Sequence, residues 1–370
     1  DIEHSPLGVN DGQVRVGAAA IKTTLVHDDS LSASFVEFLE GFVEAEPLTI
    51  DTQVAFDGKT DTRVQLSAYQ YQQDGVDVDF DGVDYSMTVA EDAVLGSGTL
   101  GAIEFRGEGG VLRLSPGRIN TDLARIEQSV YSGSNGIEFD EFTISSDDPM
   151  GPEATLGSIA VQSNTQVEDD HLSSRTLLSV GSIDSPLPVH AASLETSVSK
   201  LSIEGIQSYI DTISQLSMSD AMLKDDPAII RRVFEAYVPM IGPGTGLDVG
   251  VAFSNEGGDA SLSYGIGVID ESVPAYPVNG LASIVTIRDL LNVLTLEAHL
   301  EADAAAIDQT PLAMFMMSPQ AQQVVVADGT SYISDMTLKE LIVDINGNPL
   351  ALEMLLGDKL DMPLADIMAL

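Results

Sequence analysis

The chain has 370 residues, 44% of them hydrophobic, and its 58 acidic and 16 basic residues give a net charge of -42. This length and apolar content are enough for one large or two ordinary folded domains and argue against disorder. The charge argues against nucleic acids and anionic lipid headgroups as partners, because both need Lys and Arg to neutralise phosphate. We interpret it as a solvated surface typical of salt adaptation, with a site for a cationic partner as the alternative.

The chain contains no cysteine, which excludes disulfides, thiolate metal sites and cysteine nucleophiles but leaves the redox compartment open. It also lacks any apolar run of about 18 residues, the length from which a transmembrane helix is predicted. The chain begins at Asp1, so we expect an upstream segment, either a signal or an anchor, that is missing from this sequence.

Two patterns precede the central part of the chain. Apolar and polar residues alternate from Ile2 to Val26, and the alternation is broken at Gly8 and at the turn signal Asn10-Asp11-Gly12. From Ser30 to Val43 apolar residues recur at intervals of three and four, which predicts a short amphipathic helix, with a functional loop as the alternative.

Between Leu48 and Leu114, alternating apolar and polar runs end three times in Phe-x-Gly, at Phe56, Phe80 and Phe105. Alternation places successive side chains on opposite faces of a strand, and the glycine supplies a turn or bulge. Each unit therefore predicts a strand leading into a hairpin. From Pro116 to Tyr131 apolar residues recur at helical spacing, which predicts one short helix or a crossover.

Short strands follow at intervals of about twenty residues, with no helix between them long enough for a parallel crossover. The sequence therefore predicts a mainly β fold with some helices (α+β), in which a long curved antiparallel sheet is joined by a helical hairpin and further helices in the C-terminal half. The predicted strands span residues 137–144, 155–164, 175–183 and 194–203.

The pattern changes at Ile203, where helical spacing begins and predicts a helical hairpin over residues 203–240. We therefore divide the chain into an antiparallel β region, 1–202, and an α+β region, 203–370, with one continuous elongated domain as the alternative. The further predicted elements are a hairpin of 247–253 and 260–269, a strand at 294–302, a helix at 311–326 interrupted at Ser318-Pro319, and a hairpin of 338–343 and 350–355 around the turn at 344–349.

Two stretches imitate known ligand-binding motifs. Asp77 to Gly82 matches the first half of an EF-hand loop, but position twelve is Thr88 instead of the bidentate carboxylate, so we predict a strand, with a looser cation contact as the alternative. Gly96, Gly98 and Gly101 match a dinucleotide fingerprint, but a predicted strand follows them instead of a helix. We interpret those glycines as a turn between strands.

No motif points to catalysis. The five histidines lie far apart, and neither a zinc-protease motif nor a nucleophile elbow is present, so no enzyme activity, cofactor or metal site is expected. Residues 242–246 lack the lysine of a phosphate loop and are interpreted as a linker. Ten of the 12 methionines lie at or after Met218, which indicates either core packing or an adaptable apolar surface.

The arrangement resembles the YdgA-like family of bacterial proteins of unknown function. The resemblance rests on the Phe-Asp-Gly units, the strand at 136–139 with its continuation at 143–146, the strand at 201–203 leading into helices, and the closing turn at 343–350. It implies a Gram-negative envelope protein, anchored in the inner membrane by an N-terminal helix and lying largely in the periplasm. It transfers no functional residue to this chain.

From these observations we expect a non-enzymatic cell-envelope protein that binds a lipid or other hydrophobic ligand in a groove between sheet and helices. The alternative is a periplasmic scaffold that offers a sheet edge or the helical hairpin to an envelope protein or to a second copy. No nucleic acid partner is expected, and contact with the membrane is expected only through the upstream anchor. The candidate surface comprises Ile206, Ile210, Ile213, Met314, Phe315 and Met317.

Overall fold

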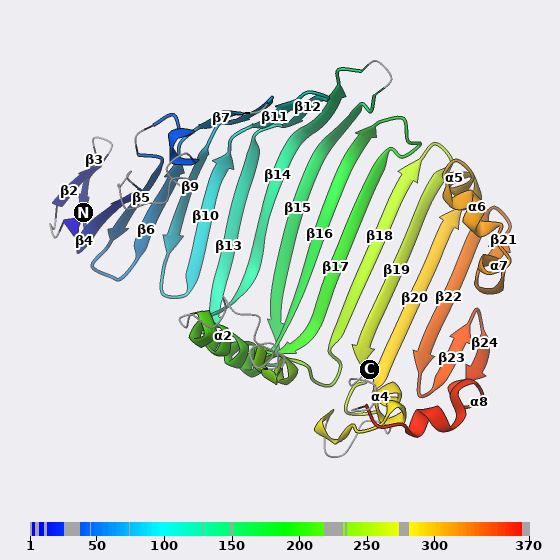
Figure 1. The fold of residues 1–370 in the computed structure, drawn as a ribbon. Coiled ribbons are helices and arrows are strands. Elements are labelled where there is room, and N and C mark those ends of the chain that lie inside the picture. The colour runs from blue at the N-terminus through cyan, green and yellow to red at the C-terminus, as the bar shows by residue number, and fades with distance from the viewer. Residues whose placement is uncertain are drawn as a thin grey trace. The chain divides into compact units, whose positions relative to one another are not determined.

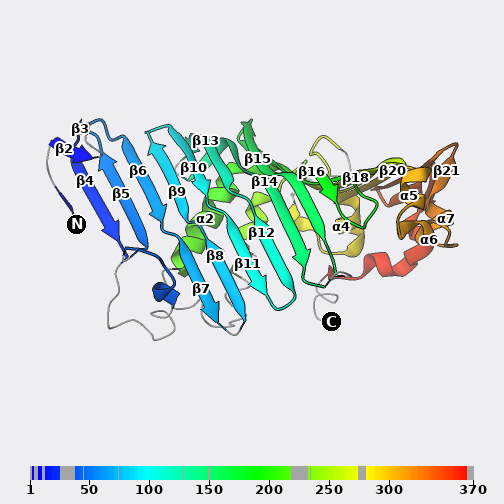
Figure 2. The same ribbon diagram turned by 90° about the horizontal axis from the view of Figure 1, so that it is seen from above.

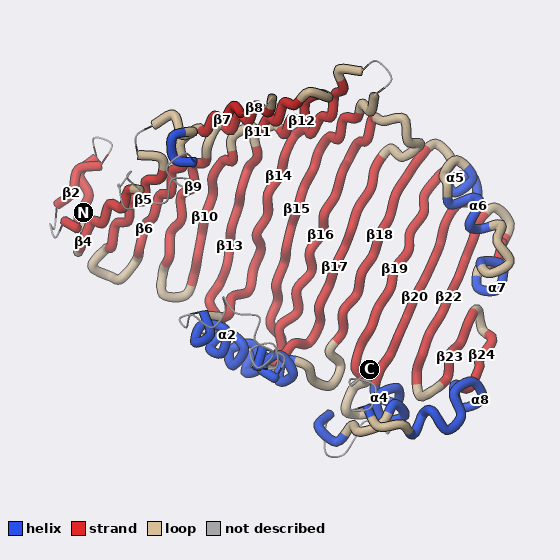
Figure 3. Tube along the Cα trace, in the orientation of Figure 1, coloured by secondary structure: helices blue, strands red, loops and turns tan. Residues whose placement is uncertain are grey.

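The computed structural model describes residues 2–3, 7–10, 13–25, 38–44, 46–73, 75–127, 129–148, 151–217, 232–233, 235–273 and 281–364. The protein is mainly β, and 22 strands are assigned to one antiparallel sheet, with several helices in the C-terminal half (Figures 1 and 3). This confirms the predicted fold class. The chain divides into two compact units, Asp1–Asn164 with Leu178–Pro186, and Thr165–Leu177 with Leu187–Leu370. The division at residue 203 stays a prediction.

The first unit is an antiparallel meander. A separate small hairpin pairs β2 (Leu7–Asn10) with β3 (Gln13–Val16). The main strands are β1 (Ile2–Glu3), β4 (Ala19–Thr24), β5 (Leu48–Val54), β6 (Thr60–Leu66), β7 (Tyr69–Gln73), β8 (Val76–Phe80), β9 (Val83–Val89), β10 (Ala93–Leu100), β11 (Ile103–Gly107), β12 (Gly110–Leu114), β13 (Gly117–Glu127) and β14 (Val130–Ser146). Two more, β15 (Ala154–Glu168) and β16 (His171–Asp184), have residues in both units.

Four neighbouring long strands of this unit are interrupted by a short bend. One row of pairing runs β4–β5–β6–β9–β10–β13–β14, and a second runs β7–β8–β11–β12–β14, beyond the ends of the first (Figures 1 and 2). The bends contact each other: the Gly101 amide donates to the Gly82 carbonyl at 2.6 Å, and the Asp81 amide to the Ala102 carbonyl at 3.0 Å. The bend residues thus form a line across the sheet.

One of the three hairpin predictions is wrong, because one of the predicted turns is a bend within a long strand. The units at Phe56 and Phe105 lead into the β5–β6 and β11–β12 hairpins, as predicted. The unit at Phe80 does not, because β8 and β9 pair with different strands and the chain only bends between them. Gly82 has φ +93°, and a Cβ there would lie 2.4 Å from the Leu66 carbonyl oxygen, so this bend requires glycine.

Two further predictions for this unit are wrong. The helix or crossover predicted from Pro116 to Tyr131 is β13, which pairs with β10 and β14 on its two edges. Ile119 and Leu123 are four residues apart, which suits one face of a strand as well as one face of a helix. The predicted glycine turn is wrong at Gly96 and Gly98, which lie inside β10 where a Cβ would collide with Tyr85. The motif-like stretch from Asp77 is β8, as predicted.

The second unit is also a meander, with the order β17–β18–β19–β20–β22, beyond which β21 and β23 both pair with the far edge of β22. Its strands are β17 (Ala191–Ser202), β18 (Gly246–Asn255), β19 (Gly258–Val268), β20 (Leu294–Asp303), β21 (Val326–Asp328), β22 (Ser331–Lys339), β23 (Ile342–Ile345) and β24 (Asn348–Ala351). The predicted hairpin of 247–253 and 260–269 and the strand at 294–302 are confirmed.

The described helices of this unit are α2 (Ile203–Ser217), α4 (Ile287–Val293), α5 (Ala304–Asp308), α6 (Leu312–Met316), α7 (Ala321–Val324) and α8 (Leu352–Leu356), with 3-10 turns η2 (Val238–Met240), η3 (Leu281–Ser283) and η4 (Gly357–Asp361). Four of these helices, α2, α4, α5 and α8, directly follow or precede a strand, whereas α6 lies between α5 and α7. The break at Ser318-Pro319 separates α6 from α7, as predicted, but the helix ends at Val324 and Val326 begins β21. Thr286 starts α4 by a capping box with Asp289.

The remaining predictions are confirmed in part. The first helix of the predicted hairpin is α2, whereas most of the second lies outside the described residues. Residues 38–40 are helical within the predicted helix at Ser30 to Val43, and residues 30–37 lie outside the described chain. The last hairpin forms around Asn346-Gly347 between β23 and β24, but its predicted first strand at 338–343 is wrong, because that range crosses the turn at Glu340-Leu341 that joins β22 to β23. The second strand ends at Ala351, and α8 follows it instead of a strand continuing to 355.

Candidate functional site

The sheet of the second unit has one apolar and one polar face. Because side chains alternate along each strand, the pairing register places residues of β17, β18, β19 and β20 in rows on the same face. One row joins Leu194, Val251, Leu262 and Leu300, each opposite the next. The neighbouring rows add aliphatic and aromatic side chains to the same face. We call this the apolar face, and its central residues are Leu194, Leu247, Val249, Val251, Leu262, Tyr264 and Leu300.

Helices cover the apolar face at one end. Ala260 and Ala302 are 4% and 1% exposed there and form a core cluster with Ile307 of α5, against which Met316 of α6 packs. The position of α5 follows from the chain, because α5 begins immediately after β20 ends. Figures 1 and 2 show α5, α6 and α7 grouped beside this end of β20.

The opposite end of the face is also covered. There α4 leads directly into β20 and contacts β22 and η4. Val293 of α4, Leu338 of β22 and Leu360 of η4 are buried. Arg288 of α4 holds the C-terminal segment in place, since its guanidinium donates to Glu353 at 2.5 Å and to Asp361 at 2.8 Å.

The middle of the face is open. Leu194, Val251, Leu262 and Tyr264 expose 38%, 47%, 50% and 45% of their surface. Single exposed apolar residues are ordinary on a protein surface, but a contiguous patch that crosses several strands marks an interaction or ligand site. The candidate site is therefore an apolar sheet surface that is exposed to solvent in the middle and covered by helices at both ends.

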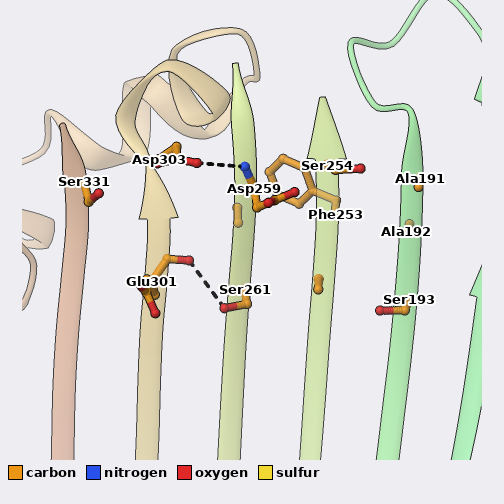
Figure 4. Close-up of a pocket in the computed structure, with 12 residues that line it drawn as sticks. Ala191, Ala192, Ser193, Phe253, Ser254, Asp259, Ser261, Glu301, Asp303 and Ser331 are labelled. Atoms are coloured by element: carbon orange, nitrogen blue, oxygen red, sulfur yellow. Dashed lines mark hydrogen bonds between the residues drawn. The ribbon is translucent and has the colours of Figure 1, made fainter. Parts of the chain in front are cut away.

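The polar face carries a shallow hollow of about 500 Å³ near the start of β17. Its walls combine small side chains, such as Ser193 and Ser261, with three acidic residues, Asp259, Glu301 and Asp303 (Figure 4). The Asp303 carboxylate accepts a hydrogen bond from the Asp259 amide at 3.0 Å, which ties β20 to β19. No group of three or more histidines and acids placed to hold a metal occurs within the described ranges.

A histidine lies on the same polar face, in the next row from Glu301. The His299 ring meets the Asp335 carboxylate at 2.6 Å and lies 3.8 Å from Glu301. The hydrogen bond to Asp335 raises the pKa of His299 above its ordinary value. Both side chains of the His299–Asp335 pair are about half exposed or more, at 47% and 61%, which is typical of a surface ion pair.

Comparison with known proteins places the chain in a family. The model of a family described as bacterial protein of unknown function (DUF945) matches residues 1–353. The chain belongs to this family. DUF945 membership makes it a bacterial protein and brings no activity or binding residue with it. No curated protein and no solved structure matched the chain.

In this DUF945 protein, the residues predicted from the sequence lie at opposite ends of the second unit's strands. Ile206, Ile210 and Ile213 lie on α2, directly after β17, and are half-buried. Met314, Phe315 and Met317 lie in or just after α6, near the end of β20, and are 81%, 59% and 69% exposed. The structure does not bring the two groups together into one surface.

The apolar face was missed as a candidate site in this DUF945 protein, although its strands were predicted. The alternation of Leu247, Val249 and Val251 signals that one face of β18 is apolar. Alternation within one strand does not show whether a helix covers the apolar face, because the helices that could cover it come from distant parts of the sequence. None of the described helices is long and apolar enough to cross a membrane.

Proposed function

We propose that this chain is a non-enzymatic cell-envelope protein that binds a lipid or other hydrophobic ligand on the apolar face of its second unit. The observation that carries the proposal is the row from Leu194 through Val251 and Leu262, which is apolar and exposed between two helix-covered ends. Water over such a face is displaced favourably by hydrocarbon, at about 25 cal/mol per Å² of apolar surface removed from water.

The dimensions of the face suit an extended hydrocarbon chain. Neighbouring strands lie about 4.8 Å apart, so the apolar row from Leu194 on β17 to Leu300 on β20 spans roughly 14 Å. This is the scale of an extended fatty acyl chain. The helices at α4 and at α5–α6 lie at the ends of the strands, so they would flank a chain lying along the row.

The proposed setting is the periplasm, with anchoring in the inner membrane by a segment upstream of this chain. Support comes from the resemblance to the YdgA-like family and from bacterial family membership. The net charge of -42 supports a ligand whose polar part is neutral or zwitterionic, because an anionic headgroup would be repelled.

The scaffold alternative predicts a different occupant for the same face. A second copy of the chain would cover it with an interface of about 1,000 Å² or more. Addition of a partner strand at β24 has less support, because this strand is short and contains Pro349, which lacks a backbone donor.

The test uses protein purified under native conditions and never refolded. Lipid extraction and native mass spectrometry would identify a bound hydrophobic molecule, and pyrene-labelled phosphatidylcholine presented in detergent micelles would measure binding. We expect the double variant Val251→Ser/Leu262→Ser to bind the probe at least about tenfold more weakly, since each lost apolar contact costs about 1.5 kcal/mol or more.

The matched control is Ser261→Thr/Ser263→Thr, which changes the opposite face of β19 and should bind as the wild type does. A wild-type protein that is consistently empty and ignores the probe would overturn the proposal. So would a native mass twice that of the chain that falls to one copy in the double variant, because this result would assign the face to a dimer.

A further inference from the structure

A second apolar surface lies outside the apolar face, in a segment without charge. From Gln309 to Ala327 the chain carries no acidic or basic residue, although 20% of all residues are charged and Asp308 and Asp328 bound the segment. We call residues 309–327 the uncharged segment. In a protein with a net charge of -42, such a segment leaves water for an apolar phase at a lower free-energy cost than a charged stretch does.

The side chains of this segment point in two directions. Met316 packs inward against the cluster of Ala260, Ala302 and Ile307 that closes one end of the apolar face. The residues on either side of it are exposed instead, at 59% for Phe315 and 69% for Met317. Two more exposed apolar side chains precede them, Leu312 at 45% and Met314 at 81%.

Hydrogen bonds hold the exposed side chains in this arrangement. The Thr310 hydroxyl donates to the Ile307 carbonyl at 2.9 Å and accepts from the Leu312 amide at 3.2 Å, which fixes the start of α6 to the end of α5. After α6, the Ser318 hydroxyl accepts from the Ala321 amide at 3.1 Å and starts α7. The exposed side chains are therefore presented by a fixed turn.

A comparison within the same unit shows that exposure alone does not define this surface. Met354 and Leu355 of α8 are 81% and 62% exposed as well. However, Glu353 lies beside them and pairs with Arg288, and Asp358, Lys359 and Asp361 follow within a few residues. Inserting α8 into hydrocarbon would require burying these charges, whereas inserting α6 would not.

We propose that the uncharged segment docks on the surface of a zwitterionic lipid bilayer by inserting Leu312, Met314, Phe315 and Met317. Flexible methionine side chains adapt to disordered acyl chains, and phenylalanine adds a large apolar contact. The acidic character of the chain selects against anionic bilayers. Met316 packs against the cluster that covers one end of the apolar face, so docking would place that end beside the bilayer. Transfer of a lipid from the bilayer to the face rests on the proposed function.

The experiment is flotation of the full chain with vesicles of phosphatidylcholine alone. Wild-type protein should float with the vesicles, and the triple variant Met314→Ser/Phe315→Ser/Met317→Ser should bind at least tenfold more weakly. The matched control Met354→Ser/Leu355→Ser removes equally exposed side chains from α8 and should float as the wild type does. Adding phosphatidylglycerol should weaken binding at low salt, and salt should restore it by screening.

Wild-type protein that stays in solution, or a triple variant that floats like the wild type, would overturn docking. Loss of flotation in both the triple variant and the α8 control would also overturn it, since general stickiness would then explain binding. The single variant Met314→Ser and a thermal melt of each variant distinguish weaker vesicle binding from misfolding. Protein that floats but never carries lipid leaves docking intact and overturns only the proposed function, whereas the Val251→Ser/Leu262→Ser variant should float while losing the probe.

Discussion

The side-chain amide of Asn255, at the end of β18, donates a 2.8 Å hydrogen bond to the backbone carbonyl of Ala306 in α5. Asn255 is only 9% exposed, and its carbonyl oxygen accepts from the Gly257 amide at 2.8 Å. One side chain thus shapes the β18–β19 turn and fastens the helix that closes one end of the apolar face.

Replacing Asn255 should destabilise the second unit. We expect Asn255→Ala to lower the free energy of unfolding by about 1–3 kcal/mol, because the buried Ala306 carbonyl loses its side-chain donor. Urea denaturation followed by circular dichroism measures this. Ser261→Ala, an exposed change on the neighbouring strand, should stay within about 0.5 kcal/mol of wild type. Equal effects of the two changes would contradict the assigned role.

Gly98 should tolerate no side chain. A Cβ at this position would lie 2.4 Å from the Asp84 carbonyl oxygen and 2.7 Å from the Tyr85 Cα, so β9 would have to move. We expect Gly98→Ala to cost about 1–3 kcal/mol, the usual effect of overpacking. Gly107→Ala is the control, because a Cβ there meets nothing within 4 Å. Thermal melts compare the two, and a neutral Gly98→Ala would refute the close approach of Tyr85.

The Arg63–Asp84 pair should contribute stability that depends on acid pH. Arg63 donates to both Asp84 oxygens, at 2.9 and 2.6 Å, and this hydrogen bonding lowers the pKa of Asp84 below 3.8. The contribution is therefore present above pH 3.8 and lost as the pH falls through the lower, folded-state pKa.

Both side chains of this pair are more than 40% exposed, so we expect Asp84→Asn to cost only about 0.5–1 kcal/mol at pH 7. The difference from wild type should disappear near the acid end of a urea denaturation series. Asp122→Asn, an exposed change on the same face, is the matched control and should stay within about 0.5 kcal/mol of wild type at pH 7. An Asp84→Asn effect that stays constant down to low pH would contradict the linkage.

The stability contributed by the His299–Asp335 pair should change with pH in the opposite direction. The pKa of His299 is raised above 6.5 by the hydrogen bond to Asp335. The stability gained is fully present below pH 6.5 and is lost as the pH rises through the higher, folded-state pKa. We expect wild type to exceed His299→Gln by less than about 1 kcal/mol at pH 6, because the pair is solvent-exposed, and to match it at alkaline pH. Thermal melts across this range measure the difference, and an NMR titration that finds an unshifted His299 would contradict it.

Much of the architecture follows from local patterns. The hairpin between 247–253 and 260–269 was predicted because turn residues separate two alternating runs. The β13 strand was missed because apolar residues spaced by four satisfy a helix and a strand alike, and only the pairing partners β10 and β14 decide between them. The bend at Gly82 was mistaken for a hairpin because glycine marks both features, and the choice depends on which strands lie alongside.

The candidate surface was predictable only in part. Met314, Phe315 and Met317 were named from composition and are exposed, whereas Ile206 and its companions on α2 are half-buried. Leu262 and Val251 were not named, since alternation predicts an apolar face without showing what covers it. Exposure depends on where α4, α5 and α6 end, and those positions are set by long-range contacts such as that of Asn255.

Because of its strand order, the sheet of the second unit can change in width while its topology stays the same. From β17 to β20 each strand pairs with its neighbour in sequence, so inserting or deleting one hairpin there changes the width by about 9.6 Å without rethreading any other strand. Such a change would lengthen or shorten the row through Val251 and Leu262 in steps while α4 and α5 keep their attachments to β20. The number of hairpins would then set the length of the apolar row in a relative.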